Sequence, residues 1–191
     1  MTARIVYLHG FNSSPQSHKA QVLGRYLADR GLAQRFVCPK LPHRPALAVA
    51  TVEDALGPRP EEACFVGSSL GGFYATHFAE RYGARAILIN PAIDPHAGLR
   101  AYLGEQRNLH TGEQYRLTEE HLAEWQALNV TPTLLERYLL LLETGDEVLD
   151  YRAAMQRYAG AWQRVAEGGD HTLQGFPDHL ALIVDFARLS A

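Results

Sequence analysis

The sequence predicts an α/β fold: a mostly parallel sheet of about six strands with helices on both faces. Short apolar runs alternate with segments of helical periodicity along the whole chain, as in folds built from repeated strand–helix units. Within the runs consecutive residues are apolar, which is typical of strands buried on both faces. At residues 67–71 a turn with two glycines joins one such run directly to a helical segment. These three observations favour parallel strands connected by helices.

The expected elements alternate in chain order. Strands are expected at 5–8, 35–39, 63–66, 85–90, 138–142 and 162–167, and the last run is weaker and alternating, as at the edge of a sheet. Helices are expected at 17–30, 46–56, 70–82, 148–158 and 177–189. Right-handed crossovers would place the carboxyl ends of all the strands at one edge, where such folds bind their ligands.

Residues 94–133, between the fourth and fifth expected strands, show no strand pattern. A short helical pattern comes first, and a second helix is expected to begin at Thr118, with Glu119 and Glu120 in its first turn. Connections of this length are unusual in a compact domain unless they carry function. We expect a small helical lid over the site, within a single domain that spans 1–191. The alternative is a helical excursion that only covers the sheet.

Composition excludes several functional classes. The 191 residues fit one domain, and 47% hydrophobic and 20% charged residues are ordinary for a soluble globular protein. A net charge of −3 gives no basic field for nucleic acid. No apolar run approaches the roughly 20 residues of a membrane helix, and no signal peptide is expected. Cys38 and Cys64 lack metal-ligand spacing and are expected to be buried free thiols in a cytoplasmic protein. The oligomeric state stays open.

The turn at 67–71 has the pattern of a nucleophile elbow. The residues Gly67-Ser68-Ser69-Leu70-Gly71 fit G-x-S-x-G with Ser69 at the centre. The sharp strand-to-helix turn needs small residues two positions before and after the serine, and the glycines meet this demand for Ser69 but not for Ser68. The alternative is a turn that merely lets strand and helix pack closely. The flanking strand and helix favour the elbow, with Ser69 as the candidate nucleophile.

A serine hydroxyl needs a base, normally a histidine that is oriented by a carboxylate. In this arrangement the acid follows the serine along the chain and the histidine comes last. Asp146 is expected in the turn after the fifth strand and His171 in the turn after the last strand. Asp150 and His179 compete with them, but the first is expected within a helix and the second at the start of one. We therefore favour Asp146 and His171.

The tetrahedral intermediate needs two backbone N–H donors for its oxyanion. One is expected at Leu70, directly after the nucleophile, and the other in the loop 9–14 after the first strand, where Phe11 is best placed. His9, at the start of that loop, is expected to be a structural hydrogen-bonding group rather than a catalyst.

Several other side chains are candidates for structural or cavity-lining roles. Ser13 and Ser14 are expected to be polar loop residues that could line an acyl site. Asp170 is expected to cap its turn, and His77 and His121, on expected helices, should have ordinary surface or half-buried positions. Aromatic residues could line an apolar acyl pocket or belong to the core: Phe11, Phe73, Tyr74, Tyr102 and Trp125.

Five motifs in order span nearly the whole chain: YLHGFNSSP at 7–15, GSSLGG at 67–72, NPA at 90–92, TGDEVLDY at 144–151 and EGGDH at 167–171. Together they resemble the YqiA-type esterases, small bacterial members of the α/β-hydrolase superfamily. The resemblance implies a trimmed α/β-hydrolase fold that begins at the third strand of the superfamily's full sheet. It also implies a triad at Ser69, Asp146 and His171, and hydrolysis without metal or cofactor.

The sequence thus predicts a serine hydrolase that cleaves small-molecule carboxylic esters or acyl-CoA-type thioesters through an acyl-enzyme. A catalytically silent protein of this fold, which binds a small acyl ligand or a protein partner, is the alternative, because the fold does not guarantee chemistry. A peptidase would use the same residues, so the sequence leaves that substrate class open.

Overall fold

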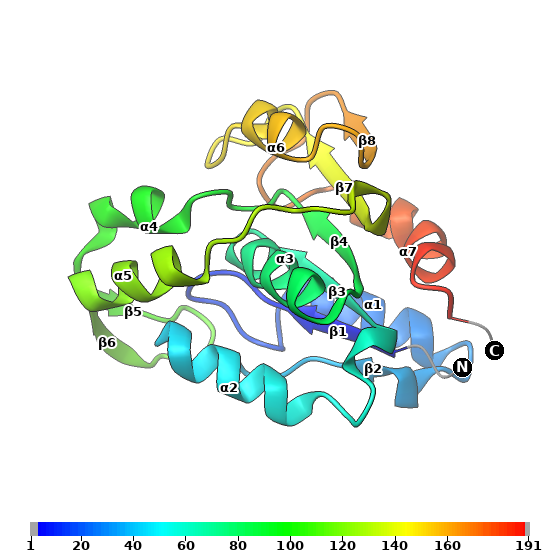
Figure 1. Ribbon diagram of the computed structural model, residues 1–191, viewed down its shortest axis with the longest axis horizontal. Coiled ribbons are helices and arrows are strands. Elements are labelled where there is room, and N and C mark those ends of the chain that lie inside the picture. Colours follow the sequence, from blue (N-terminus) through cyan, green and yellow to red (C-terminus); the bar gives the residue numbers. More distant parts are fainter. Residues whose placement is uncertain (1–3, 190–191) are drawn as a thin grey trace.

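The computed structural model describes residues 4–189 and has the expected alternation of strands and helices (Figure 1). Six strands form one sheet, and every neighbouring pair is parallel. Their order across the sheet is β2-β1-β3-β4-β7-β8. The predicted α/β class is confirmed. The strands are β1 (Arg4–Leu8), β2 (Phe36–Val37), β3 (Ala63–Ser68), β4 (Arg85–Ile89), β7 (Tyr138–Glu143) and β8 (Trp162–Ala166).

Helices cover both faces of the sheet and bury both. Along β1, Ile5 and Tyr7 belong to one core cluster, whereas Val6 and Leu8 belong to the other. Because side chains alternate between faces, this explains why strands of a doubly covered sheet are continuously apolar. The first cluster packs against α1 (His18–Ala28) and α7 (Leu180–Phe186), and the second against α2 (Pro45–Ala55), α3 (Leu70–Tyr82) and α6 (Tyr151–Arg157).

Several elements are shorter than the sequence pattern predicts. The second strand has two residues instead of five, and it lies at an edge of the sheet. Asp150 lies just before α6 and caps it, so the helix begins later than expected. A 3₁₀ turn, Phe176–His179, replaces the first turn of the predicted last helix. The weak strand β8 is at the opposite edge, as its alternating pattern predicts.

Residues 94–133, hereafter the insertion, connect the adjacent strands β4 and β7. The prediction that this segment has no strands is wrong, because β5 and β6 pair as an antiparallel hairpin. One of the two, β5, has the sequence GEQR, so it lacks the apolar alternation by which a strand is predicted. Figure 1 shows the insertion at the end of the molecule opposite the start of β1. Its elements are α4 (Pro95–Gly98), β5 (Gly104–Arg107), β6 (Gln114–Leu117) and α5 (Glu119–Leu128).

The helix expected at Thr118 is confirmed as α5. Thr118 is its N-cap, and His121 completes a capping box with its side chain. His121 was expected at a surface or half-buried position, and this prediction is wrong, because its side chain is buried. Its second ring nitrogen, Nε2, lies 3.1 Å from Nδ1 of His43, which covers the ring. The same prediction is correct for His77, which is half-buried.

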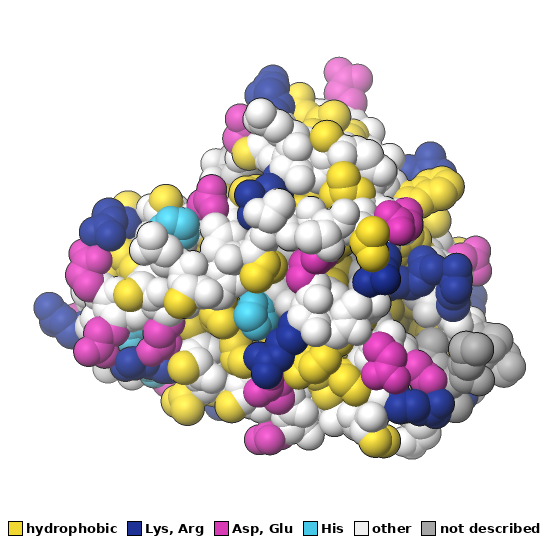
Figure 2. Space-filling view, in the orientation of Figure 1, with side chains coloured by type: hydrophobic (Ala, Val, Ile, Leu, Met, Phe, Trp, Pro, Cys, Tyr) yellow, Lys and Arg dark blue, Asp and Glu magenta, His cyan; other side chains and the backbone are white. Residues whose placement is uncertain are grey.

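Charge and cysteine placement are ordinary. On the face shown in Figure 2, basic and acidic side chains are interspersed. Cys64 is buried, but Cys38 is only half-buried, contrary to the prediction. Burial raises the pKa of both thiols to about 12.

Within residues 4–189 no helix has the length and apolar character to cross a membrane, and no group of three or more His, Cys, Asp or Glu side chains could hold a metal ion.

Candidate active site

Ser69 lies in the turn between β3 and α3 with a strained backbone. Its φ is 55° and its ψ is −121°, a region that residues other than glycine rarely adopt. The turn leaves no room for side chains at its glycines: a Cβ on Gly67 would overlap the Gly71 backbone, and a Cβ on Gly71 would overlap the Leu8 carbonyl group. The Ser69 N–H donates to the Ile89 carbonyl oxygen at 2.9 Å. The turn is therefore as tight as the G-x-S-x-G pattern predicts.

Asp146 and His171 lie together at the carboxyl ends of the paired strands β7 and β8. The His171 Nδ1 is 2.8 Å from Oδ2 of Asp146 and 3.0 Å from Oδ1. The Asp146 side chain is 1% exposed and that of His171 is 20% exposed. The carboxylate also accepts hydrogen bonds from the N–H groups of Val148 and Leu149, at 2.9 and 2.8 Å. Since a carboxylate only accepts, Nδ1 of the neutral imidazole carries the proton, and Nε2 keeps a lone pair.

A cavity of about 840 Å³ has both Ser69 and His171 in its lining. Its walls come from the loop after β1, from the insertion and from the loops after β7 and β8. The competing histidine, His179, which the structure also describes, is not in this lining. The competing carboxylate, Asp150, accepts a hydrogen bond from the Arg152 N–H at 3.0 Å, whereas Asp146 is the one in contact with His171. The structure therefore places Ser69 in one cavity with His171, and His179 does not share that cavity.

The aromatic and serine candidates divide between cavity and core. Phe11 and Tyr102 line the cavity, together with Ser13. Ser14 is buried and its hydroxyl accepts a hydrogen bond from the Gln16 N–H at 3.1 Å. The remaining aromatic candidates are buried in the core: Phe73, Tyr74 and Trp125.

The loop 9–14 passes directly beside Ser69. A Cβ on Gly10 would lie 3.4 Å from the Ser69 Cβ and 3.9 Å from its Oγ. The peptide that joins Gly10 to Phe11 is therefore next to the serine hydroxyl. Leu70, whose N–H is the other expected donor, is the first residue of α3. Both backbone groups are thus adjacent to Ser69 in the fold.

His9 fixes the direction of the peptide between Gly10 and Phe11. The imidazole is buried; its Nδ1 lies 3.1 Å from the Gly10 carbonyl oxygen, and its Nε2 accepts a hydrogen bond from the Leu41 N–H at 3.1 Å. Burial lowers the pKa of His9, so the ring is neutral, with Nδ1–H as the donor. In a planar trans peptide the N–H points away from the C=O. By holding the Gly10 carbonyl, His9 sets the orientation of the Phe11 N–H, which is a structural role, as predicted.

Asn90 connects three strand ends and was not predicted as a site residue. It is 2% exposed and follows β4. Its Nδ2 donates to the carbonyl oxygens of Asp170 and His171 at 3.1 and 3.2 Å, and its Oδ1 accepts from the Glu143 N–H at 3.1 Å. A polar residue at the end of a buried apolar run is the sequence signal that could have identified it.

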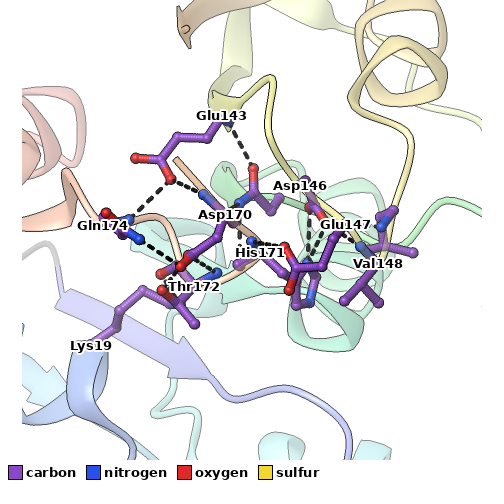
Figure 3. A network of polar contacts seen from close by, with 11 residues as sticks. Lys19, Glu143, Asp146, Glu147, Val148, Asp170, His171, Thr172 and Gln174 are labelled. Atoms are coloured by element: carbon purple, nitrogen blue, oxygen red, sulfur yellow. Dashed lines mark hydrogen bonds and ion pairs between the residues drawn. The ribbon is translucent and has the colours of Figure 1, made fainter. Parts of the chain in front are cut away.

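Glu143, the last residue of β7, holds the loop that carries His171 (Figure 3). The side chain is 4% exposed, and its carboxylate accepts hydrogen bonds from the N–H groups of Asp170, Gln174 and Gly175 at 2.9, 3.0 and 3.0 Å. Three N–H donors satisfy a buried carboxylate without a cation. The loop is therefore attached to the interior of the sheet by Glu143 and Asn90.

Three exposed hydrogen bonds add to the network around this loop. Glu147 Oε2 accepts a hydrogen bond from the His171 N–H at 3.0 Å, and Asp170 Oδ1 accepts one from the Thr172 N–H at 2.8 Å, which caps the turn as predicted. Lys19 Nζ donates to the Thr172 carbonyl oxygen at 2.6 Å from α1. The histidine loop is thus held from three sides.

Acidification should destabilise the fold, because burial lowers the pKa of four histidines: His9, His77, His121 and His179. With these pKa values lowered in the folded state, the unfolded chain binds protons more readily below about pH 6.5. The free energy of unfolding should therefore be highest above that pH and should fall as the pH drops through the lowered pKa values.

Urea unfolding at about pH 7.5 and 5.5 measures this effect. Equal free energies of unfolding at the two pH values would contradict the prediction.

The family of this chain follows from its sequence relatives. A family model described as "Uncharacterised protein family (UPF0227)" matches residues 4–188. A UPF0227 protein of Serratia proteamaculans (strain 568) is 26% identical over 196 residues, which cover 97% of this chain and 99% of the relative.

Solved structures share the fold at lower identity. A protein of Agrobacterium vitis S4 described as a hydrolase has a TM-score of 0.74 at 18% identity, over 97% of this chain and 88% of that one. Mouse alpha/beta hydrolase domain-containing protein 10 has a TM-score of 0.67 at 17% identity, over 97% and 89%. The esterase domain of a Rhodothermus marinus protein has a TM-score of 0.62 at 17% identity, over 97% and 85%. The chain therefore belongs to the UPF0227 family and has the α/β-hydrolase fold, as its five motifs indicate.

Proposed function

We propose that this protein is a serine hydrolase that cleaves carboxylic esters or acyl thioesters, with Ser69, His171 and Asp146 as its triad. One observation carries the proposal: Ser69, in a tight turn with a strained backbone, lines the same cavity as His171, whose imidazole is hydrogen-bonded to the buried carboxylate of Asp146. An esterase domain among the proteins of like fold supports the same reaction class.

In the first half of the reaction, Ser69 Oγ attacks the carbonyl carbon of the substrate while His171 Nε2 takes the hydroxyl proton. The carbonyl oxygen becomes an oxyanion, which accepts hydrogen bonds from the N–H groups of Leu70 and Phe11. Asp146 stabilises the imidazolium. The intermediate then collapses, and the alcohol or thiol leaves with the proton from His171. An acyl group remains on Ser69.

In the second half, water attacks the acyl carbon and gives its proton to His171. A second tetrahedral intermediate forms at the same N–H groups and collapses. The carboxylic acid leaves, and Ser69 Oγ regains its proton from His171. The cycle uses side chains and backbone groups of this chain and needs no metal or cofactor.

The cavity favours a small-molecule substrate with an apolar acyl group. Its volume of about 840 Å³ is within the range of small-molecule sites. Phe11 and Ile93 line it beside the elbow, and Leu99 and Tyr102 line it from the insertion. We propose that the insertion is a lid of a single-domain bacterial enzyme, which acts in the cytoplasm and not on nucleic acid.

Labelling with a fluorophosphonate tests the proposal directly. The reagent should form a covalent adduct at Ser69 in the folded wild-type protein, and mass spectrometry of the digested protein should locate it. Ser68→Ala is the matched control, because it leaves Ser69 and the glycines of the elbow unchanged. This variant should still be labelled at Ser69. A folded wild-type protein without an adduct would favour the silent alternative. Nitrophenyl esters and acyl-CoAs of graded length, with peptide amides beside them, would then define the substrate.

The buried carboxylate of Glu143 should matter for both stability and activity. In Glu143→Gln the amide nitrogen would face backbone N–H donors, so at least one buried donor loses its acceptor, at a cost of about 1–3 kcal/mol in the free energy of unfolding. The loop that carries His171 should loosen, and kcat should fall more than KM changes. Glu167→Gln, an exposed neighbour on the same loop, should leave both quantities unchanged. Equal behaviour of the two variants would contradict this role.

A further inference from the structure

Three hydrogen bonds join the β5–β6 hairpin of the insertion to the loop 9–14. The Tyr115 O–H donates to Asn12 Oδ1 at 2.8 Å, and Asn108 Nδ2 donates to the Ser13 carbonyl oxygen at 2.8 Å. Asn12 Nδ2 in turn donates to Gln106 Oε1 at 3.3 Å. The partners come from β6, from the turn and from β5, so each part of the hairpin holds the loop at one point.

On the side that faces the hairpin, the loop has an unusual backbone conformation and incomplete packing. Asn12, directly after Phe11, has a φ of 51°, a left-handed conformation that costs free energy in residues other than glycine. Behind the loop is a cavity of about 30 Å³, lined by Phe11 and Asn12 on one side and by Tyr115 and Trp125 on the other. The three hydrogen bonds therefore connect the loop to the hairpin at a place where close packing between them is interrupted.

The hairpin has its own attachment to the body of the protein. The Tyr115 ring stacks on His43 with centroids 4.2 Å apart and an interplanar angle of 10°. Next to it, Arg44 forms an ion pair with Glu124 of α5 at 2.6 Å. His43 and Arg44 precede α2, which packs on the sheet. The Tyr115 hydroxyl is therefore presented to Asn12 from a fixed support.

We infer that the insertion is part of the catalytic machinery and not only a cover: its hairpin holds the Phe11 N–H at the place where the oxyanion forms. His9 holds the same peptide through the Gly10 carbonyl. Asn12, Asn108 and Tyr115 are positioning residues, since none of these three described residues lines the cavity that contains Ser69. The inference rests on the proposed hydrolase function and adds to it the part of the chain that aligns one oxyanion donor.

Two conservative variants remove single bonds and keep the hairpin. Tyr115→Phe loses only the hydroxyl that donates to Asn12. Asn108→Asp keeps the oxygen that accepts from the N–H groups of His110 and Thr111, and therefore keeps the turn, but it loses the donor to Ser13. With nitrophenyl acetate as substrate, each should lower kcat by about tenfold and change KM by less than about twofold, because the oxyanion contact exists only in the transition state.

The double variant should lose less than the product of the two single losses, because both bonds hold one loop. Arg116→Ala is the matched control: Arg116 lies in the same hairpin, is exposed and pairs with Glu105 at 2.8 Å, and its kcat should stay within about twofold of the wild type. Expressing kcat per fluorophosphonate-labelled site removes any effect of misfolded protein.

Wild-type kcat in both single variants would overturn the inference, as would a rise in KM with kcat unchanged. The labelling of Ser69 separates this failure from failure of the proposed function. An adduct on active wild-type protein with unaffected variants removes the positioning role alone. A wild-type protein with neither adduct nor turnover removes both, because the loop then has no oxyanion to hold.

Discussion

Replacing Ser69 by alanine should lower kcat for ester hydrolysis by roughly 10⁵- to 10⁶-fold, because no other group can form the acyl-enzyme. The residual rate would come from the oxyanion donors and from binding. Steady-state kinetics on a nitrophenyl ester, with protein purified free of host esterases, measures the loss. KM should change little, since the hydroxyl contributes mainly to the transition state.

Stability measurements on two variants at the same position give an independent check of the elbow. Ser69→Ala keeps a Cβ at φ 55° and should unfold at nearly the wild-type urea concentration. Ser69→Gly should be equally inactive but more stable by about 1 kcal/mol, because glycine relieves the backbone strain at a smaller entropic cost. A Ser69→Ala enzyme with wild-type kcat would refute the nucleophile assignment.

Asp146→Asn should cost about 10⁴-fold in kcat, by the effect that the same change has in other Ser-His-Asp enzymes. The carboxylate now accepts the Nδ1 proton of His171 and two backbone N–H bonds. An asparagine that keeps its oxygen on the backbone donors turns its amide N–H toward His171. The imidazole then takes the tautomer with its proton on Nε2, which cannot accept the proton of Ser69.

Asp150→Asn is the control for this change. Asp150 caps α6 through its side-chain oxygen, and asparagine is an equally good N-cap. We expect kcat and the free energy of unfolding to stay close to those of the wild type. If Asp150→Asn were the more damaging of the two, the acid of the triad would have to be reassigned.

Strands and site loops were predictable where local sequence determines them. The central strands β3, β4 and β7 are continuous apolar runs, so their sequence alone predicts burial on both faces. Parallel strands end at one edge, which made the turns after β7 and β8 the places to look for Asp146 and His171. The order of the elements along the chain is enough to predict these positions, without any contact between distant residues.

Features that depend on distant partners could not be predicted in this way. The β5–β6 hairpin is short and largely polar, and its bonds to the loop 9–14 connect residues about 95 positions apart, as between Asn108 and Ser13. Asn90 and Glu143 gain their roles from a loop 27 to 81 positions away. His121 is buried because His43, 78 positions earlier, meets it. In each case the tertiary contact, not the local pattern, decides the outcome.

The edge strand β8 is the weakest part of the sheet, with Trp162 66% and Val165 40% exposed, and it should fray first on warming. His171 lies in the loop after this strand, yet its anchors are at the ends of interior strands: Asn90 follows β4, and Glu143 is the last residue of β7. Unfolding of β8 alone would therefore leave the His171 imidazole beside the Asp146 carboxylate. Activity should then be lost on heating at the temperature at which the interior strands unfold, several degrees above the temperature at which β8 frays.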